Sequence, residues 1–462
     1  MPRPPVPVIS WDRFILPSGT RHGAEEGDTM RRTGHHALRN SGVAGFLMLL
    51  LFSSPPSERV HGQEPPPNVR IAQEREEVLK WQRREIQARN APEAFLQAAG
   101  VSSDPAQLTA FLTPRAAAQA NERRIQDLIA QLGSEDFQTR ADAQRELVLI
   151  GVPALDAVRA ATRSEDAEVA ARARQCSAEI NEQQAVVVAA LCALLKKEPK
   201  AVLPFLKSRN PHVKDILVQE LGELKADANW AVPALLEALD DENKPIHYHT
   251  RRTLAVALAP KDFPLVVAAA KSERVAMRAG ALSLFNYFPD QGSVCVPLLL
   301  EALHDKDPLV RRAAAITLGT FPSKKVVDAL VEALADDTDS YAPKLEWSVA
   351  QSAAWGLFGC EKEAGPAIPA LVRTLKNEKA RKETRLHVAG VLGRIGGRNK
   401  ALAPEVTAGL AETLQSAKDA QLRAASLFGL ALIGPTAKGA APQILTVLRE
   451  MPPGTSDPQC FP

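Results

Sequence analysis

Apolar residues recur at helical spacing in a series of short segments between residues 124 and 451. In each segment leucine, valine or isoleucine returns every three or four residues, which places these side chains on one face of an α-helix. The clearest segments are Val232-Pro-Ala-Leu-Leu-Glu-Ala-Leu239, Val296-Pro-Leu-Leu-Leu-Glu-Ala-Leu303, Ile368-Pro-Ala-Leu-Val-Arg-Thr-Leu375 and Val327-Asp-Ala-Leu-Val-Glu-Ala-Leu334. Proline is tolerated in the first turn, because the first N–H groups of a helix have no helical acceptor. The pattern predicts a series of amphipathic helices that begin near such prolines.

A second motif predicts the start of the helix that follows each of these segments. Asp or Asn is followed four residues later by Arg or Lys in the pairs Asp136–Arg140, Asn210–Lys214, Asp307–Arg311 and Asp419–Arg423. Asp166 begins a weaker copy, with Ala170 in place of the cation. The Asp or Asn side chain accepts hydrogen bonds from the free N–H groups of the first turn. Glycines close these second helices, where we expect a left-handed residue, at Gly151, Gly222, Gly319, Gly359, Gly396 and Gly434.

The two motifs alternate with a period of roughly 30 to 40 residues, as in helical-hairpin repeats. Each unit contains a first helix with the leucine stripe (helix A) and a second helix that begins at the Asp or Asn (helix B). The units are 124–151, 152–181, 183–224, 229–259, 260–289, 292–321, 324–360, 365–397, 400–434 and a terminal half-unit, 438–451. A repeated helical unit predicts an all-α solenoid of stacked hairpins over residues 124–451.

The N-terminal residues have the pattern of an export signal. Arg31 and Arg32 precede an apolar run at 43–52, which is too short to span a bilayer. We expect residues 30–62 to form a signal peptide and residues 1–29 to be a non-native extension upstream of a true start at Met30. An uncleaved anchor with a cytoplasmic tail is the alternative.

Two further segments flank the predicted array. Residues 63–123 combine a charged helix with alanine-rich pieces that Gly100, Pro105 and Pro114 interrupt, which predicts an irregular helical cap and linker. Residues 452–462 are rich in proline and glycine, and we expect them to be disordered.

The helix A and helix B motifs resemble HEAT repeats, specifically the short bacterial kind called HEAT-like or phycobilin-lyase-type repeats. The resemblance covers residues 124–451 and implies a right-handed superhelix. It also implies that Asp and Arg of successive repeats form a hydrogen-bonded ladder. Carried over to this sequence, the ladder would include Asp136 with Arg140, Asp307 with Arg311, and Asp419 with Arg423. The motifs identify a fold and leave activity open.

Composition narrows the classes of function. The net charge of +2 gives no strong field that would attract nucleic acid or an anionic membrane. A basic stripe could run along the helix B starts, but acidic residues alternate with its members, which are Arg251, Arg252, Arg311, Arg312, Lys379, Arg381, Lys382 and Arg385. The five cysteines form no paired metal or redox motif, so we expect them to fill buried helix faces.

The densest polar and aromatic spot is His247-Tyr248-His249, followed by Arg251 and Arg252. Residues two apart on a helix do not share a face, so the His pair does not suggest a metal site. An exposed turn before helix B is one interpretation, and a partner-binding or anion-binding spot on the concave face is the other.

Trp347 and Trp355 lie eight residues apart on one predicted helix B, which puts both on nearly the same face. They either pack between neighbouring units or form an aromatic platform for a partner. Arg385 is a further candidate contact on the helix B side. Asp336, Asp337 and Asp339 could hold Ca²⁺, but they lack the Gly and the distal Glu of an EF-hand loop.

The sequence thus favours a non-enzymatic protein–protein interaction scaffold, exported to the periplasm or the extracellular space of a bacterium. A partner protein would dock on the concave helix B face, and we predict no catalytic residue, cofactor, metal, nucleic acid or membrane span in the mature chain. An enzyme of the phycobilin-lyase-like class, or a ligand-binding or metal-binding module, is the alternative. None of the nine histidines is followed by Glu, which excludes the paired His-Glu motifs of di-iron hydroxylases built from such repeats. A sensor that flexes on ligand binding is a third possibility.

Overall fold

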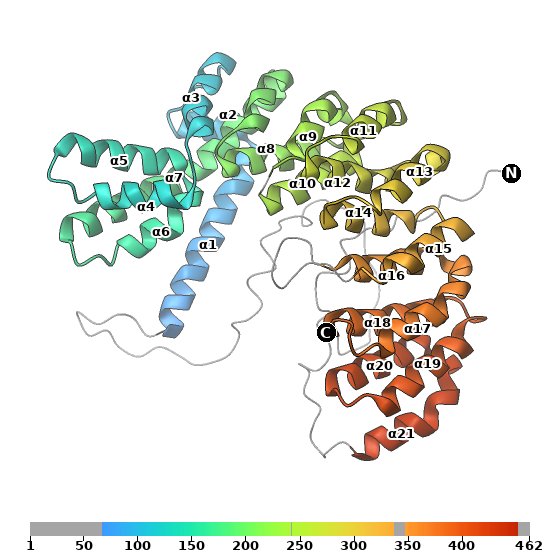
Figure 1. Ribbon diagram of the computed structural model, residues 1–462. Coiled ribbons are helices and arrows are strands. Elements are labelled where there is room, and N and C mark those ends of the chain that lie inside the picture. The colour runs from blue at the N-terminus through green and yellow to red at the C-terminus, as the bar shows by residue number, and fades with distance from the viewer. Residues whose placement is uncertain (1–66, 242, 337–346, 451–462) are drawn as a thin grey trace, which may run out of the picture. The chain divides into compact units, whose positions relative to one another are not determined.

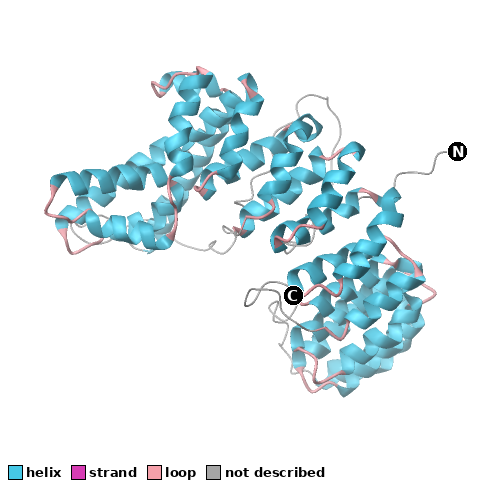
Figure 2. Cartoon of the chain, turned by 45° about the horizontal axis from the view of Figure 1, so that its top comes forward, coloured by secondary structure: helices cyan, strands magenta, loops and turns pink. Residues whose placement is uncertain are grey.

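The structure is a computed structural model that describes residues 67–241, 243–336 and 347–450 (Figure 1). Within these ranges all regular structure is helical, and no strand occurs (Figure 2). The chain divides into two units, Met1–Gln73 and Glu74–Pro462. Of the first unit only the start of α1 (Pro67–Asn90) is described, so the fold below is that of the second unit. The predicted extension at 1–29, the signal peptide at 30–62 and the tail at 452–462 lie outside the described residues.

The second unit is a stack of helical hairpins in two layers, which confirms the all-α solenoid. The helix A layer contains α4 (Glu122–Gln131), α6 (Leu155–Ala161), the 3-10 segment η3 (Pro199–Lys207), α9 (Val232–Ala238), α11 (Phe263–Ala270), α13 (Gly292–Ala302), α15 (Lys324–Ala333), α17 (Ile368–Lys376), α19 (Ala403–Ser416) and α21 (Ala441–Glu450). The helix B layer contains α5 (Phe137–Ile150), α7 (Ala167–Lys197), α8 (Pro211–Glu223), α10 (Lys244–Ala257), α12 (Val275–Leu284), α14 (Pro308–Leu318), α16 (Val349–Gly359), α18 (Lys382–Arg398) and α20 (Ala420–Ile433). Each helix B packs against the next helix B along the chain.

Short 3-10 segments lead from one hairpin into the next. They are η2 (Val152–Ala154), η4 (Lys225–Ala231), η5 (Pro260–Asp262), η6 (Phe285–Tyr287), η7 (Pro289–Gln291), η8 (Glu361–Ala367) and η9 (Gly434–Ala440). Pro233 and Pro369 lie in the first turn of their helices, as predicted. Pro297 lies inside α13 instead, because that helix begins five residues earlier, at Gly292.

The helices before the array are α1, α2 (Pro92–Ala98) and α3 (Pro105–Ala117). Helices α2 and α3 pack against α7, and α3 also contacts α5 and α8. Leu96, Leu108 and Leu112 are fully buried there. This segment therefore covers apolar surface of α7 rather than of α4, the first helix of the array.

The predicted helix B caps are confirmed. The carboxylates of Asp136, Asp307 and Asp419 accept the N–H groups of Thr139, Leu309 and Leu422 at 2.7, 2.8 and 3.0 Å. Asn210 and Asp166 cap α8 and α7 in the same way. Each side chain satisfies an N–H group that has no helical acceptor.

One predicted unit boundary is wrong. Residues 152–181 and 183–224 were expected to form separate hairpins, but α7 runs unbroken through residue 182 for 31 residues. No Gly or Pro interrupts residues 167–197, so nothing in the chain ends the helix there. By length and composition α7 could cross a membrane, yet 72% of its apolar window is buried inside the protein. A core helix has these properties, and no other helix in the described ranges meets the same criteria.

The helix-closing glycines fall into two classes. Gly151 and Gly434 have φ values of +73° and +71°, so they end α5 and α20 in the left-handed conformation that was predicted. Gly222, Gly319, Gly359 and Gly396 do not, and for them the prediction is wrong. At these positions a neighbouring element lies so close that a larger side chain would collide with it. A Cβ on Gly319, for example, would lie 2.6 Å from the carbonyl oxygen of Gly356 in the next helix B.

The basic residues of the helix B motif connect successive hairpins. Arg311 donates through Nη1 to the carbonyls of Asp305 and Lys306, and through Nε to Asp336 Oδ2 at 2.6 Å. Asp307 itself is the cap of α14, so the carboxylate partner of Arg311 belongs to the next turn. Arg278 repeats this geometry, with both carboxylate oxygens of Asp305 at 2.9 and 3.2 Å.

Other members of the predicted ladder differ in their contacts. Arg140 bonds to the carbonyl of Ser134 and lies 3.5 Å from Glu168. Asp419 accepts Lys382 Nζ at 2.8 Å from the preceding helix B. The backbone N–H of Arg423 donates to the carbonyl oxygen of Asp419 at 3.1 Å, as in the first turn of any helix. The contribution of these residues to stability stays a prediction.

Two apolar clusters form the core. The main cluster contains residues 88–112 of the N-terminal helices, the C-terminal half of α7 and every later hairpin. The second cluster is formed by α4, α5, α6 and the N-terminal half of α7, with Leu128, Leu147 and Val158 at its centre. Helix α7 contributes to both clusters.

The close contact between α18 and α20 predicts a sharp difference between two glycines of one helix. A Cβ on Gly393 would lie 2.5 Å from the Cα atom of Gly429, whereas a Cβ on Gly390 would have no atom within 4 Å. We expect Gly393→Ala to lower the free energy of unfolding by about 2 kcal/mol or more. Gly390→Ala should raise it by roughly 0.5 to 1 kcal/mol. Urea unfolding followed by circular dichroism measures both, and equal effects would contradict the assigned contact.

The Arg278–Asp305 pair allows a second comparison on one helix. The side chains of Arg278 and Asp305 are 13% and 15% exposed, and burial alone would raise the pKa of Asp305. The hydrogen bonds and charge of Arg278 lower it instead. We expect Arg278→Ala to lower the free energy of unfolding by about 2 to 3 kcal/mol. The pair between Arg274 and Glu237 is exposed, so Arg274→Ala should lower the free energy of unfolding by less than about 1 kcal/mol. Thermal unfolding of the two variants tests this order.

Candidate partner-binding surface

Three of the predicted contact residues lie in the first turns of α10, and each already has a partner. His247 Nδ1 is 2.8 Å from the carbonyl oxygen of Leu239, and His249 Nδ1 is 2.6 Å from Asp215 Oδ1 on α8. The Tyr248 ring lies 5.5 Å from the His249 ring. The segment is helical and half-buried, so its interpretation as an exposed turn is wrong. The two histidines bind different elements and do not converge on one site.

Arg251 and Arg252 follow on the same helix. Arg252 is exposed, and Arg251 is half-buried near Tyr248, Tyr287 and Arg312. Burial lowers the pKa of Arg251, and the positive charge of Arg312 acts in the same direction. These residues form a cationic spot on the helix B layer between α10 and α14.

Trp347 and Trp355 meet on the helix B layer, together with a residue that the sequence did not single out. Trp347 precedes Ser348, the cap of α16, so the prediction that both tryptophans lie on one helix is wrong. Their ring centroids are nevertheless 5.4 Å apart. His387 of α18 lies 4.4 Å from Trp347 and 6.2 Å from Trp355. We call Trp347, Trp355 and His387 the aromatic cluster.

Cationic side chains border the aromatic cluster. The Arg394 guanidinium lies 5.8 Å from the Trp355 ring, and that of Arg398 lies 4.5 Å from the Phe358 ring. Such distances are typical of cation–π contacts. Burial and, to a smaller extent, the charge of Arg394 together lower the pKa of His387 to about 4. His387 is therefore a neutral ring at physiological pH, and its buried Nε2 atom has no hydrogen-bond partner among the described residues.

The surface that results is half-buried. Trp355 packs partly on the main core, and Trp347 and His387 are also intermediate in exposure. The tryptophans thus contribute to packing between neighbouring hairpins and are only partly buried. Their interpretation as an aromatic platform for a partner stays a prediction.

Arg385 is not part of the aromatic cluster. Its Nε atom donates to the carbonyl oxygen of Leu375 at 2.8 Å, so it joins the end of α17 to the start of α18. This contact resembles the carbonyl bonds of Arg278 and Arg311 in their own turns. Its role as a partner contact stays a prediction.

The candidates for metal chemistry have other roles or lie outside the structure. Asp336 accepts Arg311, and Asp337 and Asp339 are outside the described residues. In the described part of the chain, no three His, Cys, Asp or Glu residues lie close enough to hold a metal ion. Cys176, Cys192, Cys295 and Cys360 are free and buried, as predicted for residues that fill helix faces.

Comparison with known proteins identifies part of the array. Residues 263–350, from α11 to the start of α16, match the HEAT repeats family. A curated relative, Protein ILITYHIA of Arabidopsis thaliana, is 24% identical over 30% of this chain. The chain matches only 6% of the length of that protein.

Solved structures show similarity at low identity. Kap121p is 13% identical over 71% of this chain and 43% of that chain, with a TM-score of 0.44. Kap95p, in a structure with RanGDP, is 15% identical over 70% of this chain and 53% of that chain, with a TM-score of 0.43. An engineered protein is 18% identical over 72% of this chain and 95% of that chain, with a TM-score of 0.35. Similarity at this level says nothing about what this chain binds. The similarity to HEAT repeats at residues 263–350 thus lies within a longer array of helical hairpins.

Proposed function

We propose that this chain is a non-enzymatic protein-interaction scaffold that docks a partner protein on its helix B layer. The observation that carries the proposal is the aromatic cluster, in which side chains from α18 and from the start of α16 meet beside Arg394. Tryptophan and arginine are enriched among the residues that dominate binding energy at protein interfaces. Half-buried rings suit this role because they are already held in place and lose little side-chain freedom on binding.

The repeat architecture supports the proposal. Hairpins that contact only their neighbours leave the outer side of each helix B available along the array. The cationic spot around Arg251 and the aromatic cluster lie on the same layer, on α10 and on α16 with α18. A long partner segment could engage both, which would raise the overall affinity above that of either contact alone.

We further propose that the protein acts outside the cytoplasm. This rests on the arginines and the apolar run of residues 30–62, which are typical of a secretory signal peptide.

Replacing Trp347 should weaken partner binding without unfolding the array. Trp347 precedes the cap of α16, so Trp347→Ala removes ring contacts but no helical residue. We expect roughly tenfold or more weaker binding of the main partner. The measurement is affinity capture from an envelope extract with quantitative mass spectrometry, followed by a binding titration with the protein recovered.

The matched control is Lys324→Ala on the helix A layer, whose side chain is 87% exposed. It should recover the partner as the unaltered protein does. If Trp347→Ala recovers the same proteins in the same amounts, docking at the aromatic cluster is wrong.

The N-terminus of the native protein tests the proposed export. We expect the mature chain to begin at Gln63, after cleavage at Gly62, and to be found in the periplasm or the medium. N-terminal peptide mass spectrometry of fractionated cells measures both. A native peptide from residues 1–29 would contradict the proposed start at Met30, and an intact 30–62 segment on the purified protein would indicate a retained anchor.

A further inference from the structure

An open groove of about 530 Å³ lies between α5 and α7 on the helix B layer, away from the aromatic cluster. Helix α3 contributes Arg115 to its wall. The lining residues are Arg115, Phe137, Ala141, Gln144, Arg145, Val148, Leu149, Arg172, Gln175, Glu179 and Gln183. Two of its three arginines are paired with carboxylates, Arg145 with Asp142 at 2.9 Å and Arg172 with Glu168 at 2.7 Å. Among the described residues, Arg115 is thus the arginine of this lining that has no carboxylate partner.

Arg115 is half-buried and has no carboxylate partner among the described residues. It donates through Nη1 to the carbonyl oxygen of Phe111 at 2.7 Å and through Nη2 to Gln183 Oε1 at 2.5 Å. A guanidinium carries five N–H donors, so further donors are available. By contrast, Arg89 binds Glu220 at 2.5 Å and Arg278 binds Asp305 at 2.9 Å.

The charge of Arg115 is therefore poorly compensated. Burial lowers its pKa to about 10, which reflects the loss of solvation of the guanidinium. The Phe111 ring, 3.6 Å away, holds the guanidinium in place and offers a partial interaction with its charge. A half-buried cation is stabilised most by an anion with matching geometry, and a carboxylate accepts two parallel N–H bonds from arginine.

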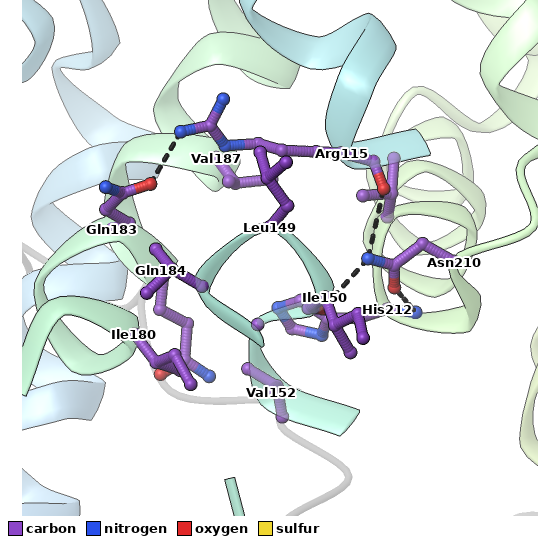
Figure 3. A pocket seen from close by; sticks show the side chains of 13 residues that line it. Arg115, Leu149, Ile150, Val152, Ile180, Gln183, Gln184, Val187, Asn210 and His212 are labelled. Atoms are coloured by element: carbon purple, nitrogen blue, oxygen red, sulfur yellow. Dashed lines mark hydrogen bonds between the residues drawn. The ribbon is translucent and has the colours of Figure 1, made fainter. Parts of the chain in front are cut away.

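Figure 3 shows how Arg115 is held next to a small cavity of about 20 Å³, which shares part of its lining with the groove. Its guanidinium points toward Gln183 on α7, and the Asn210 side chain donates to the Arg115 carbonyl oxygen at 3.1 Å and to that of Ile150 at 2.9 Å. Asn210 is 2% exposed. These bonds fix the end of α3 against α5 and α8, so the guanidinium is positioned before any ligand binds.

The rest of the lining suits a peptide. Gln144 is bonded to both Glu179 and Arg172, Gln175 donates to Glu179 at 3.0 Å, and Gln183 accepts Arg115, which leaves the Gln175 carbonyl and the Gln183 amino group for a peptide backbone. Phe137 is 67% exposed at the start of α5, and Leu149 lies near the end of the same helix, so the groove offers one apolar contact at each end. Glu179 lies in the same groove and would repel a continuous phosphate backbone.

We propose that the α5–α7 groove is a second docking site, which binds an acidic segment of a partner protein through a carboxylate on Arg115. An apolar side chain next to that carboxylate packs on Leu149, and one farther along the segment packs on Phe137, about 18 Å away along α5. Gln175 and Gln183 bind the backbone of the segment.

The test begins with a random dodecapeptide phage library panned against the immobilised full chain and against its Arg115→Gln variant. We expect the unaltered chain to enrich peptides with Asp or Glu beside a large apolar residue, and the variant to lose this enrichment. An enriched peptide is then labelled with fluorescein and titrated by fluorescence anisotropy. Arg115→Gln should weaken its binding about tenfold or more, and Glu→Gln or Asp→Gln in the peptide should have a similar effect. Arg115→Lys keeps the charge but loses the planar guanidinium, so its affinity for the peptide should lie between that of the unaltered chain and that of Arg115→Gln.

Control variants separate the groove from the rest of the surface. Arg274 precedes α12 and is paired with Glu237 outside the groove, so Arg274→Gln should leave peptide binding unchanged. Trp347→Ala should also leave it unchanged, so failure of one docking site is distinguishable from failure of the other. The thermal midpoint of Arg115→Gln should stay within about 2 °C of the unaltered chain, because the variant removes a poorly compensated charge.

Three results would overturn the proposal. The first is panning that enriches no acidic motif, or one that Arg115→Gln leaves intact. The second is a single-stranded dodecathymidylate that binds in the groove as tightly as the selected peptide. The third is a large fall in the thermal midpoint of Arg115→Gln with unchanged peptide binding, which would make Arg115 a structural residue.

Discussion

Burial of apolar side chains between neighbouring hairpins is the constraint on which the rest of this structure depends. A pair of short helices cannot cover its own leucine stripe, so each hairpin is completed by the one before and the one after. Fully burying one leucine contributes about 1.5 to 3 kcal/mol, and residues such as Leu217, Leu371 and Leu410 are fully buried in this way. Close packing of the helix B layer then requires small residues at the crossings, as at Gly393 and Gly429. Surface sites consequently combine side chains from two or three consecutive hairpins.

Features of the fold that depend on local chemistry could be predicted from the sequence. The caps at Asp136, Asn210 and Asp419 follow from hydrogen bonds within three residues of each cap. The repeat period does not predict the length of α7, because a regular period implies a helix end where the segment contains no helix-breaking residue. The closing glycines were misassigned at four positions, because a sequence does not distinguish a left-handed residue from one pressed against a neighbouring helix.

The candidate surface is predictable only in part, because contacts between different hairpins leave no pattern in the sequence. The spacing of eight residues indicates that Trp347 and Trp355 lie close together, and their rings are in contact. His387 joins them from the next hairpin, and no pattern in the sequence relates it to either tryptophan. The two histidines of α10 contact Leu239 and Asp215 instead of forming one site, and the sequence pattern does not indicate these partners. Arg115 lies before the array, where the repeat gives no register, so only the packing of α3 on α7 reveals its position.

The division of the core into two clusters has a consequence for cooperativity. Residues around Leu128, Leu147 and Val158 bury one another, and they meet the main core chiefly where α7 passes from one cluster into the other. Local unfolding can therefore release α4, α5 and α6 while the later hairpins stay folded, since regions with separate apolar contacts open with separate free energies. We therefore expect equilibrium unfolding of this chain to show more than one transition. We also expect amides in the first half of α7 to exchange with solvent at the rate of the smaller unit, and those in its second half at the rate of the larger one.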